Sequence, residues 1–393
     1  MNIANGLNKF LFITCFFLLT FLMMSTNIAS AIYPLYKANY ILTSFQVTKV
    51  FSAYIFGLIP MLIISSWLAK KIGIRTILII SVIIAAIGIL IIGFGANFYS
   101  LCVGRILQGI SIGLSAGNIA SSLIENEPSR NPNRASLATG LAMTIGGGGG
   151  PIIGAIIAEN TLNPTLFPYL FIFFLLISII PFLFFLPNIK YKQKFNLPNI
   201  PVDIKRVFYT CSFVAFLCWS ITAMFLSLIP VALGNILGGG NLVYPALAAS
   251  SILIISGIVQ ILAIKLNPKF NIYSGFILLI ISGVILLISQ FKSLPFLIIL
   301  CSIISGLGHG LTFLGVTRLL NSIINYHVDK PKILSSYNIF IYLGVGIPTL
   351  IFGSLTIIFS IKVSISFFAI YMVIASFAGI KFINKLIKED LLN

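Results

Sequence analysis

Charge is what this sequence most lacks. Only 8% of its 393 residues are charged, against about 25% in soluble globular domains. A water-soluble fold needs polar residues on its outward faces, yet 59% of the chain is hydrophobic and runs such as Ile77–Ile92 are apolar on every side. The composition therefore excludes a soluble globular protein and indicates that lipid surrounds most of the chain.

Acidic residues are especially scarce, and we expect all seven in loops or at the end of the chain, with none inside a membrane span. They are Glu125, Glu127, Glu159, Asp203, Asp329, Glu389 and Asp390. The five cysteines lie in apolar runs without metal-ligand spacing, so neither a disulfide framework nor a zinc site is expected. The spans also lack paired carboxylates and a Ser/His/Asp arrangement, so we predict no enzyme activity.

Long apolar runs are what the sequence has in plenty. In hydrocarbon every backbone group needs a hydrogen-bond partner, and runs of about 20 apolar residues select helices over a barrel. We predict an all-α polytopic membrane protein with twelve transmembrane helices. They cover residues 10–35, 45–69, 74–94, 98–121, 136–158, 167–187, 207–235, 243–264, 271–289, 295–317, 335–358 and 364–381. The first run is too long for the apolar region of a signal peptide, so it is kept as a span.

The net charge of +17 is explained by membrane topology. If the N-terminus is cytoplasmic, all but five of the 24 Lys and Arg residues fall at inside positions, as the positive-inside rule requires. The exceptions are Lys37, Lys49, Arg105, Lys292 and Lys362. We therefore predict an integral protein of the plasma (inner) membrane with both termini cytoplasmic, and no nucleic-acid partner.

A polar interval near the middle divides the chain. We predict an N-terminal six-helix bundle at residues 1–187, a cytoplasmic central loop at 188–206 and a C-terminal six-helix bundle at 207–393. Three landmark pairs recur 197 to 200 residues apart: Gly57 and Gly257, Gly109 and Gly308, and Pro151 and Pro348. Their similar separation indicates a duplicated unit. Repeated halves with a solute site near the midplane are typical of transporters.

Three segments carry a resemblance to a known family. The loop after the second predicted span contains Leu68-Ala69-Lys70-Lys71-Ile72-Gly73-Ile74-Arg75, the fourth span has Arg105 followed by Gln108-Gly109, and the fifth has Gly146–Pro151 and Gly154. These segments resemble signatures of the major facilitator superfamily, and the third resembles that of its 12-span drug/proton antiporter branch. Lys70 stands where the family has an acid, which puts that contact of the family in doubt.

The resemblance implies a set of residues whose contacts change during transport. They are Lys70, Lys71, Gly73, Arg75, Gln108, Gly109, Gly146, Gly150, Pro151 and Gly154, with Gly346 and Pro348 in the second half. Glycines four apart expose backbone for close helix contact, and a proline removes one helical hydrogen bond. The alternatives are a simple basic turn at Gly73 and plain small-residue packing in the two glycine-rich spans.

Arg105 and His309 are the candidate polar centres of the cavity. An ionised arginine inside a membrane needs a partner or a water-filled cavity, although its long stem also allows it to snorkel to the interface. His309 is a candidate proton-coupling site because its charge can change near neutral pH, the alternative being a neutral histidine hydrogen-bonded to a carbonyl or hydroxyl group. Further cavity candidates, which could equally hold helices together, are Asn27, Asn118, Trp219, Gln260 and Asn338.

The sequence therefore predicts a secondary active transporter that moves a small solute by alternating access. Export or antiport of a drug-like or metabolite solute is favoured, with import of a neutral or anionic metabolite as the alternative. A non-transporting membrane accessory protein is the alternative from another class. We expect the lipid bilayer and the solute as partners, function as a monomer, no metal and no bound cofactor, with a proton gradient as the candidate energy source.

Overall fold

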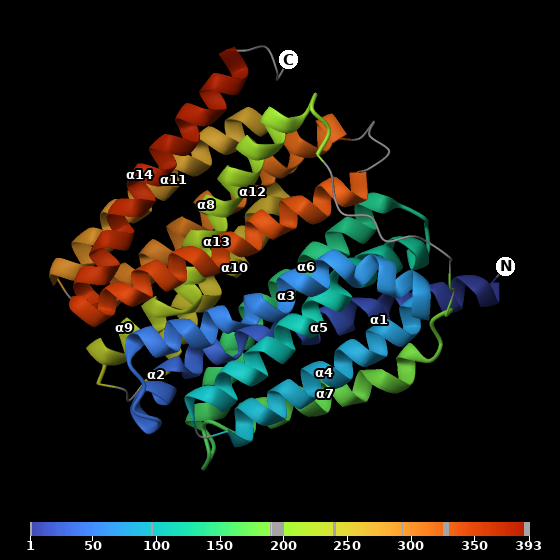
Figure 1. Ribbon diagram of the computed structural model, residues 1–393, viewed down its shortest axis with the longest axis horizontal. Helices are drawn as coiled ribbons and strands as arrows, with labels where there is room; N and C mark the ends of the chain where they lie inside the picture. Colours follow the sequence, from blue (N-terminus) through green and yellow to red (C-terminus); the bar gives the residue numbers. More distant parts are fainter. Residues whose placement is uncertain are drawn as a thin grey trace. The chain divides into compact units, whose positions relative to one another are not determined.

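The structure is a computed structural model that describes residues 2–95, 97–188, 190, 200–238, 241–292, 294–324 and 330–388. Within these residues the long regular elements are all helices, which confirms the predicted all-α fold (Figure 1). They are α1 (Asn2–Asn27), α2 (Ala29–Asn39), α3 (Ser44–Ile72), α4 (Ile74–Phe94), α5 (Phe98–Asn126), α6 (Pro132–Glu159), α7 (Phe167–Leu183), α8 (Lys205–Leu226), α9 (Leu228–Ile236), α10 (Val243–Leu262), α11 (Pro268–Lys292), α12 (Pro295–Ile324), α13 (Lys330–Ile358) and α14 (Ile361–Lys388).

Eleven helical segments of the described chain are long and apolar enough to cross a membrane. Two of them are composite, since α1 continues into α2 and α8 into α9. The remaining predicted span corresponds to α7, an apolar helix of 17 residues, which is close to the shortest length that crosses a bilayer core. The chain is thus an integral, multi-pass membrane protein.

Ser227 interrupts the seventh predicted span, since it leaves the helical region with φ −122° and ψ −77°. Pro230 contributes to this break because it has no N–H to offer the carbonyl of Leu226. The first predicted span stays helical where α1 meets α2, since Ile28 has φ −55° and ψ −33° and its N–H donates to the carbonyl oxygen of Met24 at 3.0 Å. Broken helices are typical of transporters, because a break makes backbone groups available to a site.

The chain folds into two compact units. The first comprises Met1–Leu42 with Lys49–Asn196, and the second Thr43–Thr48 with Leu197–Asn393. Within the first unit α4 packs on α5 and α7 and α1 packs on α6, while within the second α11 packs on α12 and α14 and α8 packs on α13. Figure 1 shows α4 beside α7 and α11 beside α14. The two units therefore share one pattern of helix pairs, as a duplicated bundle requires.

Glycine contacts set the register of this repeat. Gly109 of α5 lies against the backbone of α3, and Gly306 of α12, 197 residues later, lies against the backbone of α10. Gly308 packs instead on Gly275 of α11. The predicted pairing of Gly109 with Gly308 is therefore wrong by two residues. The small residues of α12 face two different neighbouring helices, and the sequence alone does not tell these faces apart.

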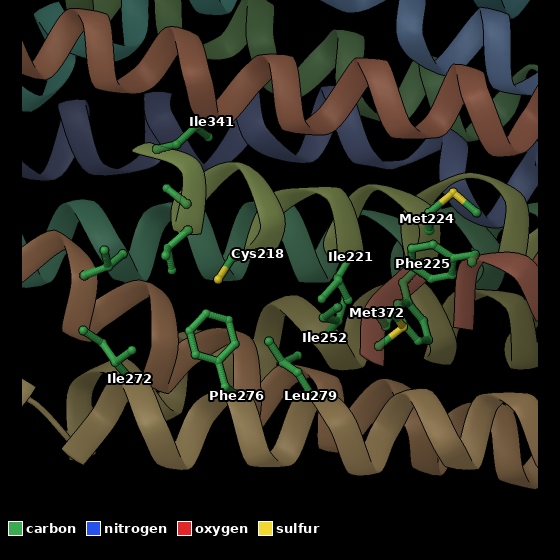
Figure 2. Close-up of a cluster of buried hydrophobic side chains, with 14 of the residues drawn as sticks. Cys218, Ile221, Met224, Phe225, Ile252, Ile272, Phe276, Leu279, Ile341 and Met372 are labelled. Atoms are coloured by element: carbon green, nitrogen blue, oxygen red, sulfur yellow. The ribbon is translucent and has the colours of Figure 1, made fainter. Parts of the chain in front are cut away.

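A continuous apolar core fills the second unit. Figure 2 shows Phe276 and Leu279 of α11 lying toward Cys218 of α8, with Ile221 and Ile252 nearby. Because lipid tails are as apolar as these side chains, van der Waals packing stabilises the core more than removal from water does. All five cysteines are unpaired, and four of them are buried.

Two acidic residues lie on helices, which corrects the prediction that all seven lie in loops or at the chain end. Glu125 is in the last turn of α5 and Glu159 is the last residue of α6. Both helices continue past the apolar segment, since a helix keeps its own hydrogen bonds outside hydrocarbon as well as inside. Glu127 and Asp203 lie between helices, and Asp329, Glu389 and Asp390 lie outside the described residues.

Candidate functional site

Arg105 lies near the start of α5, and its side chain reaches α1. Its Nη1 donates to the carbonyl oxygen of Thr26 at 2.6 Å and to Oε1 of Gln108 at 2.8 Å. Its Nη2 lies 3.4 Å from the carbonyl oxygen of Phe51 on α3. Only 3% of the residue is exposed, so Arg105 is enclosed and does not snorkel to the interface.

Neutral groups stabilise the charge of Arg105. Its guanidinium carbon lies 5.6 Å from the ring centroid of Phe51 and 5.1 Å from that of Tyr54. Desolvated cation–π contacts contribute about 2 kcal/mol, and insertion scales assign a central arginine a cost of about 2.5–3.5 kcal/mol. Hydrogen bonds to carbonyl oxygens add to the stabilisation. None of these partners carries a negative charge, so the positive field of the guanidinium is not cancelled by them.

Gln108 links Arg105 to α1. Its Nε2 donates to the carbonyl oxygen of Ser25 at 2.8 Å, while its Oε1 accepts from Arg105. The two α1 carbonyls that these side chains contact belong to Ser25 and Thr26, in the last turn of α1. The Arg–Gln pair therefore attaches α5 to the C-terminal turn of α1.

Gly146, Gly150 and Gly154 form one face of α6 that lies directly on the backbone of α1. A Cβ atom at Gly150 would lie 2.9 Å from the carbonyl oxygen of Met24, and Cβ atoms at Gly146 and Gly154 would meet the carbonyl oxygens of Thr20 and of Ile28, the residue after α1. Any larger side chain on this face pushes the two helices apart. Pro151 lies inside the same helix, where it removes one backbone hydrogen bond.

The second unit has a similar contact between α8 and α13. A Cβ atom at Gly344 would lie 2.9 Å from Cα of Phe216 on α8. The predicted residues Gly346 and Pro348 follow within the next turn, and both are buried. The close approach that the structure shows is thus centred on Gly344, two residues before the predicted Gly346.

Gly73 alone connects α3 to α4. Its φ of 97° belongs to a region that L side chains rarely adopt, and a Cβ atom there would overlap the side chain of Asn188. The Nδ2 of Asn188 donates to Oγ1 of Thr76 at 2.9 Å. Glycine is therefore required at this turn both by the backbone conformation and by the close approach of Asn188.

The basic residues around Gly73 differ in their surroundings. Arg75 donates from Nη1 to the carbonyl oxygen of Phe184 at 3.1 Å, which ties α4 to the end of α7. The Nζ of Lys71 lies 5.1 Å from the ring centroid of Trp67. Lys70 is exposed at the end of α3. The loop is thus held within the first unit by Arg75 and by the turn at Gly73.

His309 is the centre of a polar and aromatic cluster in the second unit. It is 2% exposed, and its Nδ1 lies 2.7 Å from Oγ of Ser256 on α10. The rings of Phe313, on the same helix, and Trp219, on α8, lie 5.6 Å and 5.4 Å from the imidazole ring. Its Nε2 has no hydrogen-bond partner among the described residues. The structure shows a hydroxyl group, not a carboxylate, at the bonded nitrogen.

The comparison with protein families decides the identity of the fold. The family model described as Major Facilitator Superfamily matches residues 15–347. This chain belongs to the major facilitator superfamily. Members of this superfamily are transporters, so the fold is that of a membrane transporter.

Solved structures share this superfamily fold over nearly the whole chain. A bacterial homologue of the human lysosomal transporter Spinster, in an inward-facing and occupied conformation, has a TM-score of 0.75 at 14% identity and covers 97% of both chains. The D-xylose–proton symporter has a TM-score of 0.74 at 13% identity, covering 95% of this chain and 97% of its own. A variant of the nucleoside transporter NupG has a TM-score of 0.72 at 15% identity, covering 95% and 99%. No curated protein sequence matches this chain.

The other predicted cavity residues of this superfamily member divide between the two units. Asn27 and Asn118 each donate to the carbonyl oxygen four residues earlier on their own helices, at 2.9 Å and 2.6 Å. Asn338 is exposed on α13. Gln260 and Trp219 belong to the His309 cluster. The structure thus brings together Arg105 with Gln108 in one unit, and His309 with Trp219 and Gln260 in the other.

Sequence reasoning missed Asn188, Ser256 and Glu127. Asn188 and Ser256 are single polar residues whose partners are far away in sequence, so no local pattern marks them. Glu127 accepts hydrogen bonds from the backbone N–H of Asn131 at 2.7 Å and from the hydroxyl of Ser129 at 2.8 Å. These bonds, the backbone one most, lower the pKa of the Glu127 carboxyl from its ordinary value of 4.5. The carboxylate borders a pocket of about 620 Å³ that Lys9 and Arg134 also line.

Proposed function

We propose that this superfamily member is a secondary active transporter that moves a small solute by alternating access. The observation that carries the proposal is the seam between α1 and α6, where Gly146, Gly150 and Gly154 leave backbone against backbone. The glycine face of α6 has no side chains of its own to obstruct sliding or rocking against α1. Such a seam suits two helices that shift during a transport cycle.

Export or antiport is the direction that this seam favours, because the segment that forms it resembles the signature of the drug/proton antiporter branch. A proton gradient is the proposed energy source. The proposed location is the plasma (inner) membrane with both termini in the cytoplasm, an orientation that the positive-inside pattern supports. The glycine seam also explains why no bulky residue occupies this face of α6.

An anionic or neutral polar solute is the proposed cargo. Arg105 is a buried cation whose recorded partners are all neutral, so its field attracts negative charge and repels positive charge. A carboxylate that would attract a cationic drug is absent from the predicted spans. The solute class therefore differs from the lipophilic cations that exporters with a buried acid bind.

Import of a neutral or anionic metabolite is the second candidate. It is favoured by the same charge pattern and by two structural neighbours whose descriptions name a nucleoside transporter and a D-xylose–proton symporter. At 13–15% identity these neighbours establish the fold and not the cargo. The direction in which the protein moves solute across the membrane therefore distinguishes export from import.

Flux into reconstituted vesicles tests the proposal. Purified protein is first screened by thermal shift against acidic, basic and neutral solutes, and the stabilising solute is then used in counterflow. We expect saturable flux that an imposed proton gradient accelerates. Saturation without any gradient dependence contradicts secondary active transport, and the absence of flux with every solute assigns the chain to a non-transporting role.

A pair of glycine variants tests the moving seam. Gly150→Leu places a side chain against Met24, whereas Gly140→Leu lies on the same helix at a position with nothing within 4 Å of an added Cβ atom. We expect flux to fall at least about tenfold in the first variant, equivalent to about 1.4 kcal/mol, and to be retained in the second. Normal flux in a folded Gly150→Leu protein contradicts the moving seam.

A further inference from the structure

The His309 cluster contains a hydrogen-bond relay of three side chains on two helices. Gln260, one turn after Ser256 on α10, donates from Nε2 to Oγ of Ser256 at 3.0 Å. Oγ of Ser256 lies 2.7 Å from Nδ1 of His309 on α12. The three side chains thus form a chain of two hydrogen bonds from one helix to the next.

This relay favours one tautomer of His309. The hydroxyl oxygen of Ser256 accepts the amide proton of Gln260, and we infer that the hydroxyl proton is directed at Nδ1 of His309, which lies 2.7 Å away. A neutral imidazole that accepts at Nδ1 carries its proton at Nε2. His309 therefore presents an Nε2–H donor, and this donor has no protein partner among the described residues.

Two aromatic rings pack against the imidazole that carries this donor. Phe313 stacks on the imidazole with an interplanar angle of 20°, and Trp219 stands at 85° to both rings. The indole Nε1–H of Trp219 is a second buried donor without a partner among the described residues. Two unsatisfied N–H donors on adjacent rings call for an acceptor, since buried donors are normally hydrogen-bonded.

Neither donor can be satisfied by a cation. A metal ion or an ammonium group needs a lone pair, and the lone pair of His309 already accepts from Ser256 while the indole nitrogen of Trp219 has none to offer. A carbonyl or carboxylate oxygen accepts from both kinds of donor. The rings of Trp219 and Phe313 that pack against the imidazole offer flat faces, and a planar group stacks on such a face better than a tetrahedral one does.

We propose that His309 and Trp219 form the docking point for the carbonyl or carboxylate oxygen of a planar solute, with Ser256 and Gln260 as positioning residues that hold the imidazole in its Nε2–H form. This inference rests on the proposed transport function, and it specifies the class of solute that this site in the second unit binds. Its elements all lie on α8, α10 and α12 of that unit.

Nitrogen NMR tests the tautomer without any ligand. The chain has only 2 histidines, so a His327→Gln background leaves His309 as the single imidazole. In lipid nanodiscs at neutral pH we expect ¹⁵N signals of a neutral ring protonated at Nε2. Ser256→Ala is expected to give a mixture of tautomers. A ring protonated at Nδ1, or one whose signals Ser256→Ala leaves unchanged, overturns the relay.

Tryptophan fluorescence tests the docking point. The chain has only 2 tryptophans, so a Trp67→Phe background makes Trp219 the single reporter. Titration with uridine and with sodium benzoate, which offer planar carbonyl and carboxylate oxygens, is expected to change Trp219 emission with saturation. Xylitol, which offers only hydroxyl groups on a flexible chain, is the matched control and is expected to give no saturable change.

Variants of His309 complete the test. His309→Gln retains an N–H donor near the Nε2 position and is expected to keep the affinity for the responding probe within about threefold. His309→Leu removes the donor and is expected to weaken that affinity at least about tenfold. Equal affinities in these two variants, a xylitol response like that of uridine, or no response to either planar probe overturns the proposal.

Failure of this inference is separable from failure of the transport proposal. Saturable, gradient-coupled flux in vesicles together with unchanged probe binding in His309→Leu removes the docking point and leaves transport intact. Probe binding that depends on His309, in a protein that carries no solute, supports the docking point and contradicts transport.

Discussion

Ser302 of α12 donates from Oγ to the carbonyl oxygen of Ala248 on α10 at 2.6 Å. In the first unit, Nη2 of Arg105 lies 3.4 Å from the carbonyl oxygen of Phe51, and each of these two residues precedes its counterpart in the second unit by 197 positions. Donor and acceptor are displaced by the same number of residues, so the two contacts occupy one register of the repeat. The scaffold is therefore duplicated, but its charge is not. A guanidinium stands in the first unit where a short neutral hydroxyl stands in the second.

This asymmetry predicts unequal effects at the two positions. Arg105→Lys keeps the charge but loses the planar fork that reaches both Thr26 and Phe51, so we expect flux in vesicles to fall about tenfold, equivalent to about 1.4 kcal/mol. Arg105→Met is expected to reduce flux further. Ser302→Ala is the matched control and is expected to leave most of the flux. Equal losses in the Ser302 and Arg105 variants contradict a role for the charge.

The seam between α1 and α6 predicts opposite effects of alanine at two positions of one helix. Gly140→Ala gains about 0.8–1 kcal/mol of helix propensity in open space. At Gly150 the added methyl group meets the Met24 carbonyl at 2.9 Å, and overpacking of this kind costs about 1–3 kcal/mol. Thermal unfolding in detergent is expected to show a higher melting temperature for the first variant and a lower one for the second. A raised melting temperature in both would mean that the helices can separate freely.

The turn at Gly73 predicts a conformational penalty. With φ at 97°, a side chain at this position strains the backbone by about 1–3 kcal/mol and also meets Asn188. Gly73→Ala is expected to lower the melting temperature, whereas Gly117→Ala, with nothing within 4 Å, is not. Asn188→Ala in the Gly73→Ala background relieves the overlap but not the strain, so it is expected to restore only part of the loss.

The hydrogen bonds to the Glu127 carboxylate predict that the folded protein loses stability in acid. Its pKa is lowered from 4.5 in the folded protein, mainly because the backbone N–H of Asn131 donates to the carboxylate. A lowered pKa means that the folded state favours the ionised form, so this stabilisation is present above pH 4.5 and is lost as the pH falls through the folded-state value. Glu127→Gln is expected to flatten the pH dependence of the melting temperature in that range. The exposed Glu125, changed to Gln, is the control, and equal slopes in wild type and Glu127→Gln contradict the prediction.

His309 predicts that solute binding and proton coupling can be separated. His309→Gln keeps a hydrogen-bond donor but cannot take up a proton. If His309 carries the coupling proton, this variant binds solute but its flux no longer responds to an imposed pH gradient. His327→Gln, which removes the other histidine, is expected to respond as the wild type does. A response that survives in His309→Gln removes His309 from the coupling mechanism.

Much of the fold could be predicted because hydrophobicity is a local property. Apolar runs such as Ile77–Ile92 identify membrane helices without reference to any other part of the chain, and the structure has helices at all the predicted spans. The break of the seventh span at Ser227 could not be predicted. Pro230 follows it, yet Pro60 and Pro151 lie inside helices that continue past them, because packing against neighbouring helices decides where the backbone departs from regularity.

The sequence by itself determined that this is a membrane protein, that it is built of helices in two similar halves, and that Arg105 and His309 are titratable residues within its predicted spans. Only the tertiary structure decided which groups are the hydrogen-bond partners of those two residues. It directs Arg105 to the carbonyls of α1 and Nδ1 of His309 to Ser256. It also places Gly306, not Gly308, opposite Gly109 in the repeat. These contacts join residues far apart along the chain, and such pairings depend on how helices pack and not on local composition.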